Sequence, residues 1–181
     1  MRLIVGLGNP GEKYYFTRHN AGWLALDHWL GEVSWTNSKR FNALTYQDGD
    51  CIYVKPLTFM NESGQAVRKI MDYYGLLPRS LAILHKKDAA LSDVLAVVHD
   101  DLDIEFGAWR LATDSSSAGH RGVQSIIDCL KTKKFTRLRL GIKNDLLRNK
   151  IPADKFVLQN FNSQEKSALP EIFTAAYLKK I

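Results

Sequence analysis

Two polar segments far apart in the chain contain residue types that activate water. His19 lies just before an apolar helical pattern, and the run HDDLD at 99–103 supplies carboxylates that can pair with it. An imidazole that hydrogen-bonds a carboxylate through one nitrogen keeps the other nitrogen free to take a proton from water. Such general-base help is worth about 10²–10⁴-fold in rate. From spacing alone, a capping or surface role is the more common one for a histidine at this position.

A glycine motif near the N-terminus has the letters of a dinucleotide-binding turn but not its context. The run GLGNPG at 6–11 fits G-x-G-x-x-G and follows the short apolar run Leu3–Leu7. In a cofactor-binding turn a helix begins directly after the glycines, and its N-terminus holds the phosphates. Here Pro10 removes an amide donor, and the first helical pattern begins only near Asn20. The sequence therefore argues against a nucleotide cofactor.

The aspartates of the HDDLD run support a second chemistry, the binding of Mg²⁺. Asp100, Asp101 and Asp103 offer clustered hard oxygen ligands, which this ion prefers. No Walker A sequence and no second acidic cluster accompanies them, and acidic residues after a strand are often only loop and cap residues. The chain also has no G-x-S-x-G or H-E-x-x-H motif. Its cysteines, Cys51 and Cys129, are isolated and predict neither a disulfide framework nor a zinc site.

The composition is typical of one globular domain, which we expect to span residues 1–181. The chain is 45% hydrophobic and 24% charged, enough for a substantial core. No segment approaches the length that crosses a bilayer, and the first apolar run is too short for a signal peptide. The two isolated cysteines suit a reducing compartment. We therefore expect a cytoplasmic protein that does not bind a membrane.

The positive charge of the chain is concentrated in one segment. The formal net charge is +6, and residues 121–155 contain ten Lys and Arg against three Asp, a net +7. Concentrated basicity indicates phosphate binding, although a solvated surface with excess lysine is the more common explanation of a charge run alone. In TRLRLGI, Arg137 and Arg139 alternate with Leu138 and Leu140. A strand there would bury the leucines and direct both arginines to one face.

Strand patterns alternate with helical patterns along the chain. Apolar or alternating runs predict strands at Leu3–Leu7, Leu44–Tyr46, Cys51–Lys55, Val94–His99, Trp109–Leu111 and Thr136–Ile142. The second and third of these flank QDGD, an Asp-Gly hairpin turn. Apolar residues at helical spacing predict helices at Ala21–Leu30, Glu62–Tyr74, Val123–Leu130 and Ser163–Leu178. The pattern predicts an α/β fold, a three-layer sandwich with a mixed, mostly parallel sheet flanked by helices.

The first two predicted helices carry end signals. Asn20 and Asn61 precede them as N-caps, and Gly31 and Gly75 follow them as stop residues. The stretch 76–93 has no clear pattern and fits either an extra helical turn or a mobile insertion.

Polar residues gather where the predicted strands end. Asn9 follows the first strand, the HDDLD run follows the fourth, and the loop DSSSAGHRG follows the fifth. In open α/β sheets, ligands bind outside the carboxyl ends of the strands. We therefore expect these segments to meet His19 and Asn61 in one cleft.

Five motifs together resemble those of bacterial peptidyl-tRNA hydrolase in order and spacing. They are GLGNPG, TRHNAG, TFMNESG, VVHDDLD and GHRG, and the similarity runs from residue 1 to about residue 160. The resemblance implies a single α/β domain and a monomer with no obligatory protein partner. It implies that the substrate is peptidyl-tRNA released prematurely from ribosomes. The reaction would be hydrolysis of the ester between the peptide and the terminal ribose, without a metal or a cofactor.

The resemblance also implies roles for four polar residues. The histidine of the TRHNAG-type motif is the base in the family, which places that role on His19, and the matching aspartate that orients it is Asp100. Asn9 would contact the peptide and help to reject a free α-amino group, because an ammonium desolvated beside a neutral amide is penalised. Asn61 would hold the substrate carbonyl or the attacking water, and its amide N–H would stabilise the oxyanion.

Further residues match substrate-binding positions of the family. Tyr14 and Phe59 match the lining of the groove for the tRNA end and the peptide, although core packing is an equally good prediction for Phe59. Arg110 and Arg139 match phosphate contacts. Arg121 is a departure, because the family usually has asparagine there. An arginine cannot accept a hydrogen bond, so Arg121 would donate to the ester oxygen or bind a phosphate instead.

Two other departures concern the same region. The loop DSSSAG replaces a glycine-rich run of the family, and Ala112 replaces one of two basic residues expected after the fifth strand. Two alternatives to the esterase therefore stay open. One is a catalytically silent RNA-binding paralogue of the same fold, and the other is a metal-dependent phosphoesterase that uses the HDDLD aspartates.

Overall fold

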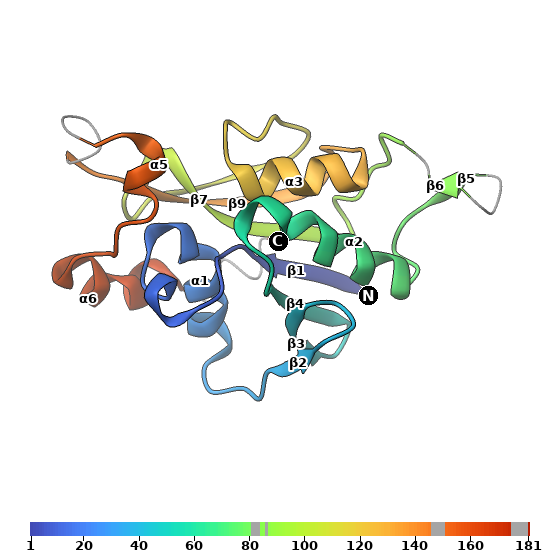
Figure 1. The fold of residues 1–181 in the computed structure, drawn as a ribbon, viewed down its shortest axis with the longest axis horizontal. Helices are drawn as coiled ribbons and strands as arrows, with labels where there is room; N and C mark the ends of the chain where they lie inside the picture. The colour runs from blue at the N-terminus through green and yellow to red at the C-terminus, as the bar shows by residue number, and fades with distance from the viewer. Residues whose placement is uncertain (81–83, 86, 146–150, 175–180) are drawn as a thin grey trace.

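The computed structural model describes residues 1–80, 84–85, 87–145, 151–174 and 181. Seven strands form one sheet in the order β2-β3-β4-β1-β7-β9-β8 (Figure 1). Their bounds are β1 (Arg2–Gly6), β2 (Thr36–Ser38), β3 (Ala43–Asp48), β4 (Cys51–Pro56), β7 (Leu95–Glu105), β8 (Trp109–Ala112) and β9 (Thr136–Lys143). The helices are α1 (Ala21–Leu30), α2 (Ser63–Tyr73), α3 (Arg121–Leu130), α5 (Ala153–Phe156) and α6 (Ser163–Ile172).

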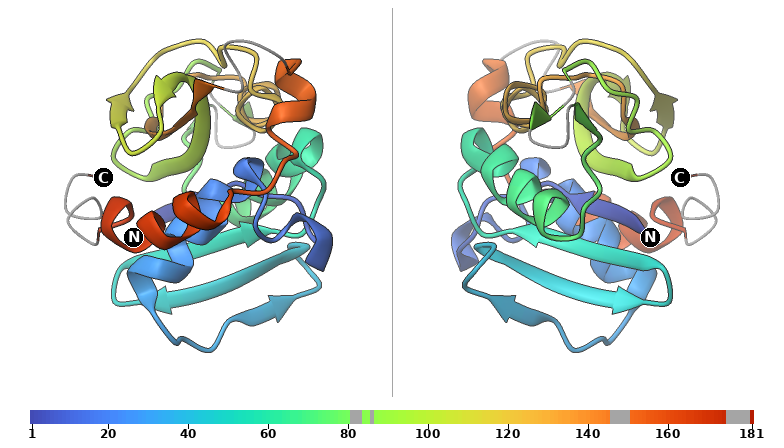
Figure 2. Two further views of the ribbon diagram at one scale, coloured as in Figure 1. Left: turned by 90° about the vertical axis from the view of Figure 1, so that its left-hand side faces the viewer. Right: turned by 90° about the vertical axis from the view of Figure 1, so that its right-hand side faces the viewer.

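The central strands are parallel and the outer ones are antiparallel. β1 pairs in parallel with both β4 and β7, and β7 pairs in parallel with β9. In both views of Figure 2, β2–β4 lie at the bottom and β7 at the top, with β1 between them. The hairpin predicted at QDGD joins β3 to β4, with Asp48 opposite Cys51 and Gly49 at a φ of 53°. β2 and β8 add antiparallel pairings at the two edges.

The two faces of the sheet bury alternate residues against different helices. On one face, Leu3 and Val97 contact the apolar side of α2 and α3. On the other face, Ile4 and Val98 pack against α1 and α6. Strands covered on both faces need an apolar residue at nearly every position, which explains the continuous runs in β1 and β7. The predicted α/β sandwich with a mixed sheet flanked by helices is confirmed.

The strand that carries the HDDLD run extends further than predicted. β7 continues through this run to Glu105, whereas the sequence placed the strand end at His99. The pairing of β7 with β9 continues into this run, because the side chains of its buried aspartates have hydrogen-bond donors. Asp100 accepts hydrogen bonds from imidazoles, and Asp101 accepts one from Arg139. Charged residues here therefore belong to the strand itself.

Several short or terminal elements also differ from the prediction. The polar strand β2 was not predicted, because it lacks apolar alternation. Within 76–93 the chain forms β5 (Arg79–Ser80) and β6 (Leu84–His85), while residues 81–83 and 86 lie outside the described residues. Helix α6 ends at Ile172, six residues before the predicted end; residues 175–180 are not described.

The predicted N-cap at Asn61 is wrong, and Asn20 occupies the N-cap position of α1 without a side-chain capping bond, whereas the predicted stop residues are confirmed. The Asn20 side chain caps no helix, because it accepts from the backbone N–H of Asn9 and donates to the backbone carbonyl of the same residue. Asn61 lies inside a 3-10 turn, η3 (Met60–Glu62), and α2 begins after it. Gly31 and Gly75 follow α1 and α2 in left-handed conformations, at φ values of 65° and 64°.

Helices α2 and α3 cross at a glycine. A Cβ added to Gly64 would lie 2.1 Å from the Ser125 carbonyl oxygen, far inside contact distance. The Ser125 hydroxyl accepts a hydrogen bond from the backbone N–H of Gly64 at 3.0 Å. The close approach therefore depends on the missing side chain.

We expect Gly64→Ala to lower the free energy of unfolding by about 1–3 kcal/mol, because the helices must separate. At a solvent-exposed position inside a helix, the same change would raise the free energy of unfolding by about 1 kcal/mol. The measurement is urea denaturation followed by circular dichroism. Gln65→Ala, at an exposed position of the same helix, is the matched control and should change stability by less than about 0.5 kcal/mol. A stabilised Gly64→Ala protein would contradict the proposed contact.

Candidate active site

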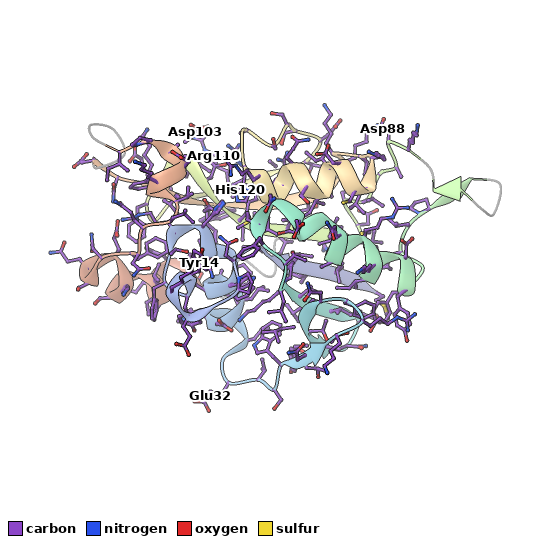
Figure 3. All side chains as sticks on the ribbon, viewed as in Figure 1. Tyr14, Glu32, Asp88, Asp103, Arg110 and His120 are labelled. Carbon is purple, nitrogen blue, oxygen red and sulfur yellow. The ribbon has the colours of Figure 1, made fainter. Side chains whose placement is uncertain are left out.

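A groove of about 540 Å³ opens where the predicted motifs come together. Its lining includes seven of the predicted site residues: Asn9, Tyr14, His19, Phe59, Asn61, Asp100 and Arg121. The opposite wall comes from the loop 117–120 and from the segment 153–158. In Figure 3, Tyr14, Asp103 and His120 lie toward the left of the view, and all three line the groove, whereas Asp88 lies at the far end. The sequence expectation of one shared cleft is met.

His19 and Asp100 form a hydrogen-bonded pair within this groove. His19 Nδ1 lies 2.9 Å from Asp100 Oδ1, although the two residues are 81 positions apart. Both are buried, with 8% and 2% of their surfaces exposed. The carboxylate can only accept, so Nδ1 carries the proton and donates it. This leaves Nε2 as the unprotonated nitrogen of the imidazole, which is the arrangement that a general base needs.

A second imidazole holds the same carboxylate oxygen. His120 Nε2 lies 2.9 Å from Asp100 Oδ1. The Nδ1 of His120 accepts hydrogen bonds from the backbone N–H groups of Gly122 and Val123, at 3.1 and 3.3 Å, and so caps α3. Because Nδ1 acts as an acceptor there, the proton lies on Nε2 and is donated to Asp100. Sequence reasoning did not identify His120 as a site residue. Its position in GHRG, directly before the start of α3 at Arg121, was a signal of a capping side chain.

The electrostatics of Asp100 follow from these two donors. Burial by itself raises the pKa of Asp100, but the facing imidazoles of His19 and His120 outweigh it and hold the pKa well below the ordinary value. Asp100 is therefore an anion throughout the neutral range. It can stabilise the charge that forms on His19 when that imidazole takes a proton.

The hydrogen bonding of this cluster opposes a metal ion. The ligand atoms of His19, Asp100 and His120 lie within 4.8 Å of one another, which is close enough to surround a cation. A metal bond to His120 Nε2 would need the proton on Nδ1, where it would face two backbone N–H donors. The Mg²⁺ alternative also loses a ligand, because Asp101 accepts from Arg139 Nε at 2.6 Å.

Asn9 presents one end of its amide to the groove. Its Oδ1 accepts from the backbone N–H of Met60 at 2.9 Å, and its own backbone is bonded to the Asn20 side chain. The Nδ2 group therefore remains to face the groove as a donor. Gly8 allows this loop to approach α1, because a Cβ there would lie 2.7 Å from the Trp23 ring. Gly6 and Gly8 thus serve close packing against α1, whereas Gly11 is needed for its backbone conformation, at a φ of 106°.

The aromatic residues predicted for the groove differ in their burial. Phe59 is 57% exposed, so the alternative of core packing is wrong for this residue, whereas the following Met60 is 4% exposed and packs in the core. Tyr14 is half-buried at the groove, at the end of the 3-10 turn η1 (Glu12–Tyr14). An exposed ring on a groove wall can stack on an apolar or aromatic part of a ligand.

The predicted arginines lie in different settings. Arg121 is exposed at the first position of α3, and its side chain has no hydrogen-bond or ion-pair partner in the described parts of the chain. Arg110 is exposed on β8, opposite Arg139 in the ladder, and neither residue lines the groove. Leu138 and Leu140 are buried as predicted.

Arg137 does not contribute to a basic surface. Its guanidinium is buried and donates to the carbonyl oxygens of Ser115 and Ser116. The expectation that both strand arginines serve one basic face is therefore wrong for this residue. Several lysines of the 121–155 segment are also paired; Lys133, Lys134 and Lys143 each lie beside a carboxylate.

Comparisons of this chain with protein families and with individual proteins point to the same family. A sequence model of the family described as Peptidyl-tRNA hydrolase matches residues 3–179. The chain belongs to the peptidyl-tRNA hydrolase family. A peptidyl-tRNA hydrolase of Listeria monocytogenes serovar 1/2a is 40% identical over 181 residues, covering 97% of this chain and 86% of the relative. One from Mycoplasma mycoides is 37% identical over 182 residues, covering 96% and 87%.

A solved structure extends the peptidyl-tRNA hydrolase similarity to the fold. The crystal structure of the enzyme from Acinetobacter baumannii is 28% identical, with a TM-score of 0.75 over 96% of this chain and 83% of that one. Membership in the peptidyl-tRNA hydrolase family confirms the predicted family and the prediction that the chain is an enzyme. Among the described residues, no helix is both long and apolar enough to cross a membrane.

The lowered pKa of Asp100 predicts a pH dependence of stability. The unfolded chain binds a proton at this residue near its ordinary pKa of about 3.9, whereas the folded chain does so only at lower pH. The stabilisation from the ionised group is thus present above about pH 4 and is lost as the pH falls below it. We expect the difference in unfolding free energy between wild type and Asp100→Asn to shrink from pH 6 to pH 3.

Urea denaturation across this range measures the difference. Asp103→Asn, at an exposed position on the same strand, is the control and should follow the wild type at every pH. A difference between wild type and Asp100→Asn that does not change with pH would contradict the assigned hydrogen bonds.

Proposed function

We propose that this chain hydrolyses the ester bond between the peptide and the terminal ribose of peptidyl-tRNA, with His19 as the general base. The substrate would be peptidyl-tRNA that has left the ribosome prematurely. The protein would work in the cytoplasm as a monomer without a metal or a cofactor. The observation that carries the proposal is the His19–Asp100 hydrogen bond inside a groove that also contains two asparagine amides.

The proposed reaction uses Nε2 of His19 for both proton transfers, while Nδ1 stays hydrogen-bonded to Asp100. Nε2 takes a proton from a water molecule as that water attacks the ester carbonyl, and Asp100 stabilises the imidazolium that forms. The tetrahedral oxyanion would be stabilised by an amide N–H of Asn61, which lies at the groove. When the intermediate breaks down, Nε2 returns the proton to the departing ribose oxygen. The peptide leaves as a carboxylic acid, which then loses its remaining proton to solvent, and the tRNA regains its hydroxyl.

The orientation of Asn9 supports selection of substrates whose amino group is blocked. Its Oδ1 is occupied by the Met60 N–H, so it offers only N–H donors to the groove. A free α-ammonium is also a donor and would find no acceptor on the exposed side of Asn9, which costs free energy when it is desolvated. A peptide carbonyl, in contrast, can accept from Asn9 Nδ2. Aminoacyl-tRNA would thereby be spared.

The groove rim supplies the proposed contacts to RNA. The exposed ring of Phe59 and the ring of Tyr14 would contact the terminal nucleotide or the peptide by stacking. Arg121, which has no partner among the described residues, would bind a backbone phosphate. Arg110 and Arg139 would add phosphate contacts beyond the groove, although Arg139 must then share its guanidinium with Asp101.

The silent RNA-binding alternative is weaker than the esterase on structural grounds. Desolvation of a buried carboxylate costs stability unless the group is hydrogen-bonded or paired. Here the pair is assembled in full, with a second imidazole that fixes the carboxylate. A protein that only bound RNA would have no need of this arrangement.

A substrate comparison tests the proposed function. We expect release of N-acetyl-aminoacyl groups from tRNA in the presence of EDTA and little release from unblocked aminoacyl-tRNA. His19→Ala should lower kcat by about 10²–10⁴-fold, because the general base is lost. The measurement is the rate of acid-soluble label released from charged tRNA.

The same assay distinguishes the alternatives. Tight tRNA binding without turnover in any buffer would support the silent paralogue. Activity that EDTA abolishes and that His19→Ala retains would support the metal-dependent phosphoesterase.

The role of Arg121 predicts a change in salt dependence. If its guanidinium neutralises one phosphate, Arg121→Ala should weaken tRNA binding and flatten the plot of log affinity against log salt by about 0.7–0.9. Fluorescence anisotropy of labelled tRNA at several salt concentrations measures the slope. Lys69→Ala, at an exposed position of α2 outside the groove lining, is the matched control. An unchanged slope in Arg121→Ala would exclude this residue as a phosphate contact.

A further inference from the structure

A buried carboxylate beside the groove joins three separate segments of the chain. Glu165 accepts from Arg18 Nη1 and Nη2 at 2.9 and 2.7 Å, from Asn144 Nδ2 at 2.9 Å and from the backbone N–H of Asn162 at 2.8 Å. Arg18 lies before α1, Asn144 follows β9, and Asn162 caps α6. Burial raises the pKa of Glu165, but the bonds from Arg18, Asn162 and Asn144 outweigh it and lower the pKa.

The Arg18–Glu165 ion pair is almost completely removed from water. The two side chains are 2% and 9% exposed. The Arg18 guanidinium carbon lies 4.5 Å from the ring centre of Phe156 and 5.1 Å from that of Phe161. Replacing a buried ion pair with uncharged side chains is often neutral or stabilising, whereas removing one partner is strongly destabilising. Stability alone is therefore a weak reason for this pair.

The pair lies directly beside the catalytic turn. Arg18 and His19 share one 3-10 turn, η2 (Arg18–Asn20). The backbone N–H of Arg18 donates to the Gln159 carbonyl at 2.9 Å, and that of His19 donates to the Val157 carbonyl at 2.8 Å. Val157 is also part of the groove wall. The segment that forms this wall is thus the one that holds the backbone of the base.

We propose that Arg18 and Glu165 are positioning residues. Their bidentate ion pair fixes the turn carrying His19 to the first turn of α6, and the Arg18 guanidinium packs on the rings of Phe156 and Phe161 in the segment that supplies the groove wall. The planar fork of arginine fixes direction as well as distance, which a single point charge would not do. The ion pair holds the His19 ring where Nδ1 meets Asp100 and Nε2 faces the groove. As an effect on catalysis, this inference rests on the proposed function.

The decisive variant removes the charge pair without leaving a buried charge alone. In Arg18→Met/Glu165→Gln, the glutamine Oε1 can still accept from the Asn162 N–H, and its Nε2 replaces the oxygen that accepted from Asn144. We expect a melting temperature close to that of wild type, because neither charge is left unpaired. We expect kcat/KM for N-acetyl-aminoacyl-tRNA to fall by about 10- to 100-fold, mostly through kcat, because small displacements of a catalytic group have effects of this size.

A second ion pair, which is partly buried, provides the control. Lys55 and Asp27 form a pair between β4 and α1, and neither residue lines the groove. Lys55→Met/Asp27→Asn removes a similar pair and should leave kcat/KM within about twofold of wild type. An equal loss of kcat/KM in both double variants would show that the Arg18–Glu165 pair acts only through overall stability, and would overturn the proposal.

An NMR measurement that does not depend on enzyme activity tests the positioning role independently of the proposed function. The buried Nδ1–H of His19, bonded to Asp100, should give a slowly exchanging imidazole proton signal by NMR, assigned by its loss in His19→Gln. We expect the signal to broaden or vanish in Arg18→Met/Glu165→Gln and to persist in the control. If wild type fails to hydrolyse the substrate, the proposed function falls, and this signal still decides the positioning role.

Arg18→Lys covers the case in which the double variant does not fold. It keeps the positive charge but loses the second hydrogen bond to Glu165, so the imidazole signal should weaken and kcat should fall while KM changes little. A wild-type signal together with wild-type kcat in this variant, or in the folded double variant, would overturn the proposal.

Discussion

The site depends on one buried carboxylate oxygen that accepts hydrogen bonds from two imidazoles. Asp100 Oδ1 meets His19 from the turn before α1 and His120 from the start of α3. Because the Nδ1 of His120 is engaged by backbone N–H groups, that ring is held as a neutral donor. His19 is then the imidazole whose second nitrogen is free for chemistry. The tautomer of His120 thus follows from backbone geometry, and that of His19 follows from its bond to the Asp100 carboxylate.

The sheet brings these segments together by its strand order. β7 lies between β1 and β9, so Asp100 on β7 is adjacent to the loop that follows β1 and carries Asn9. The 3-10 turn with His19 follows that loop, and α3 crosses α2 at Gly64 with its first turn beside Asp100. Each functional side chain is therefore placed by a rigid element or by a short turn tied to one. This is the condition under which a base and its partner keep a fixed distance.

The loop between β8 and α3 forms part of the groove lining and contains costly backbone conformations. Ala118 adopts a φ of 48° and Asp114 a φ of 52°, conformations that a side chain makes costly. Arg137 supports this loop by donating to two of its carbonyl oxygens, so a residue expected at the surface became structural. Arg121 lines the groove, and its side chain has no hydrogen-bond or ion-pair partner among the described residues. The groove therefore combines the buried His19–Asp100 pair with an exposed cation beside it.

The sequence alone determined the α/β class, most strands and the start of α1, because apolar periodicity reports burial directly. It also indicated His19, Asp100 and Asn9, whose polar types stand out beside apolar strands. Only the tertiary structure decided that β7 runs through the aspartates, that Asn20 bonds to Asn9 instead of capping a helix, and that His120 belongs to the site. A polar side chain has several partners within reach in an extended sequence. The fold determines which partner is used, because it brings particular donors and acceptors that are distant in sequence within 3 Å of each other and buries them away from water.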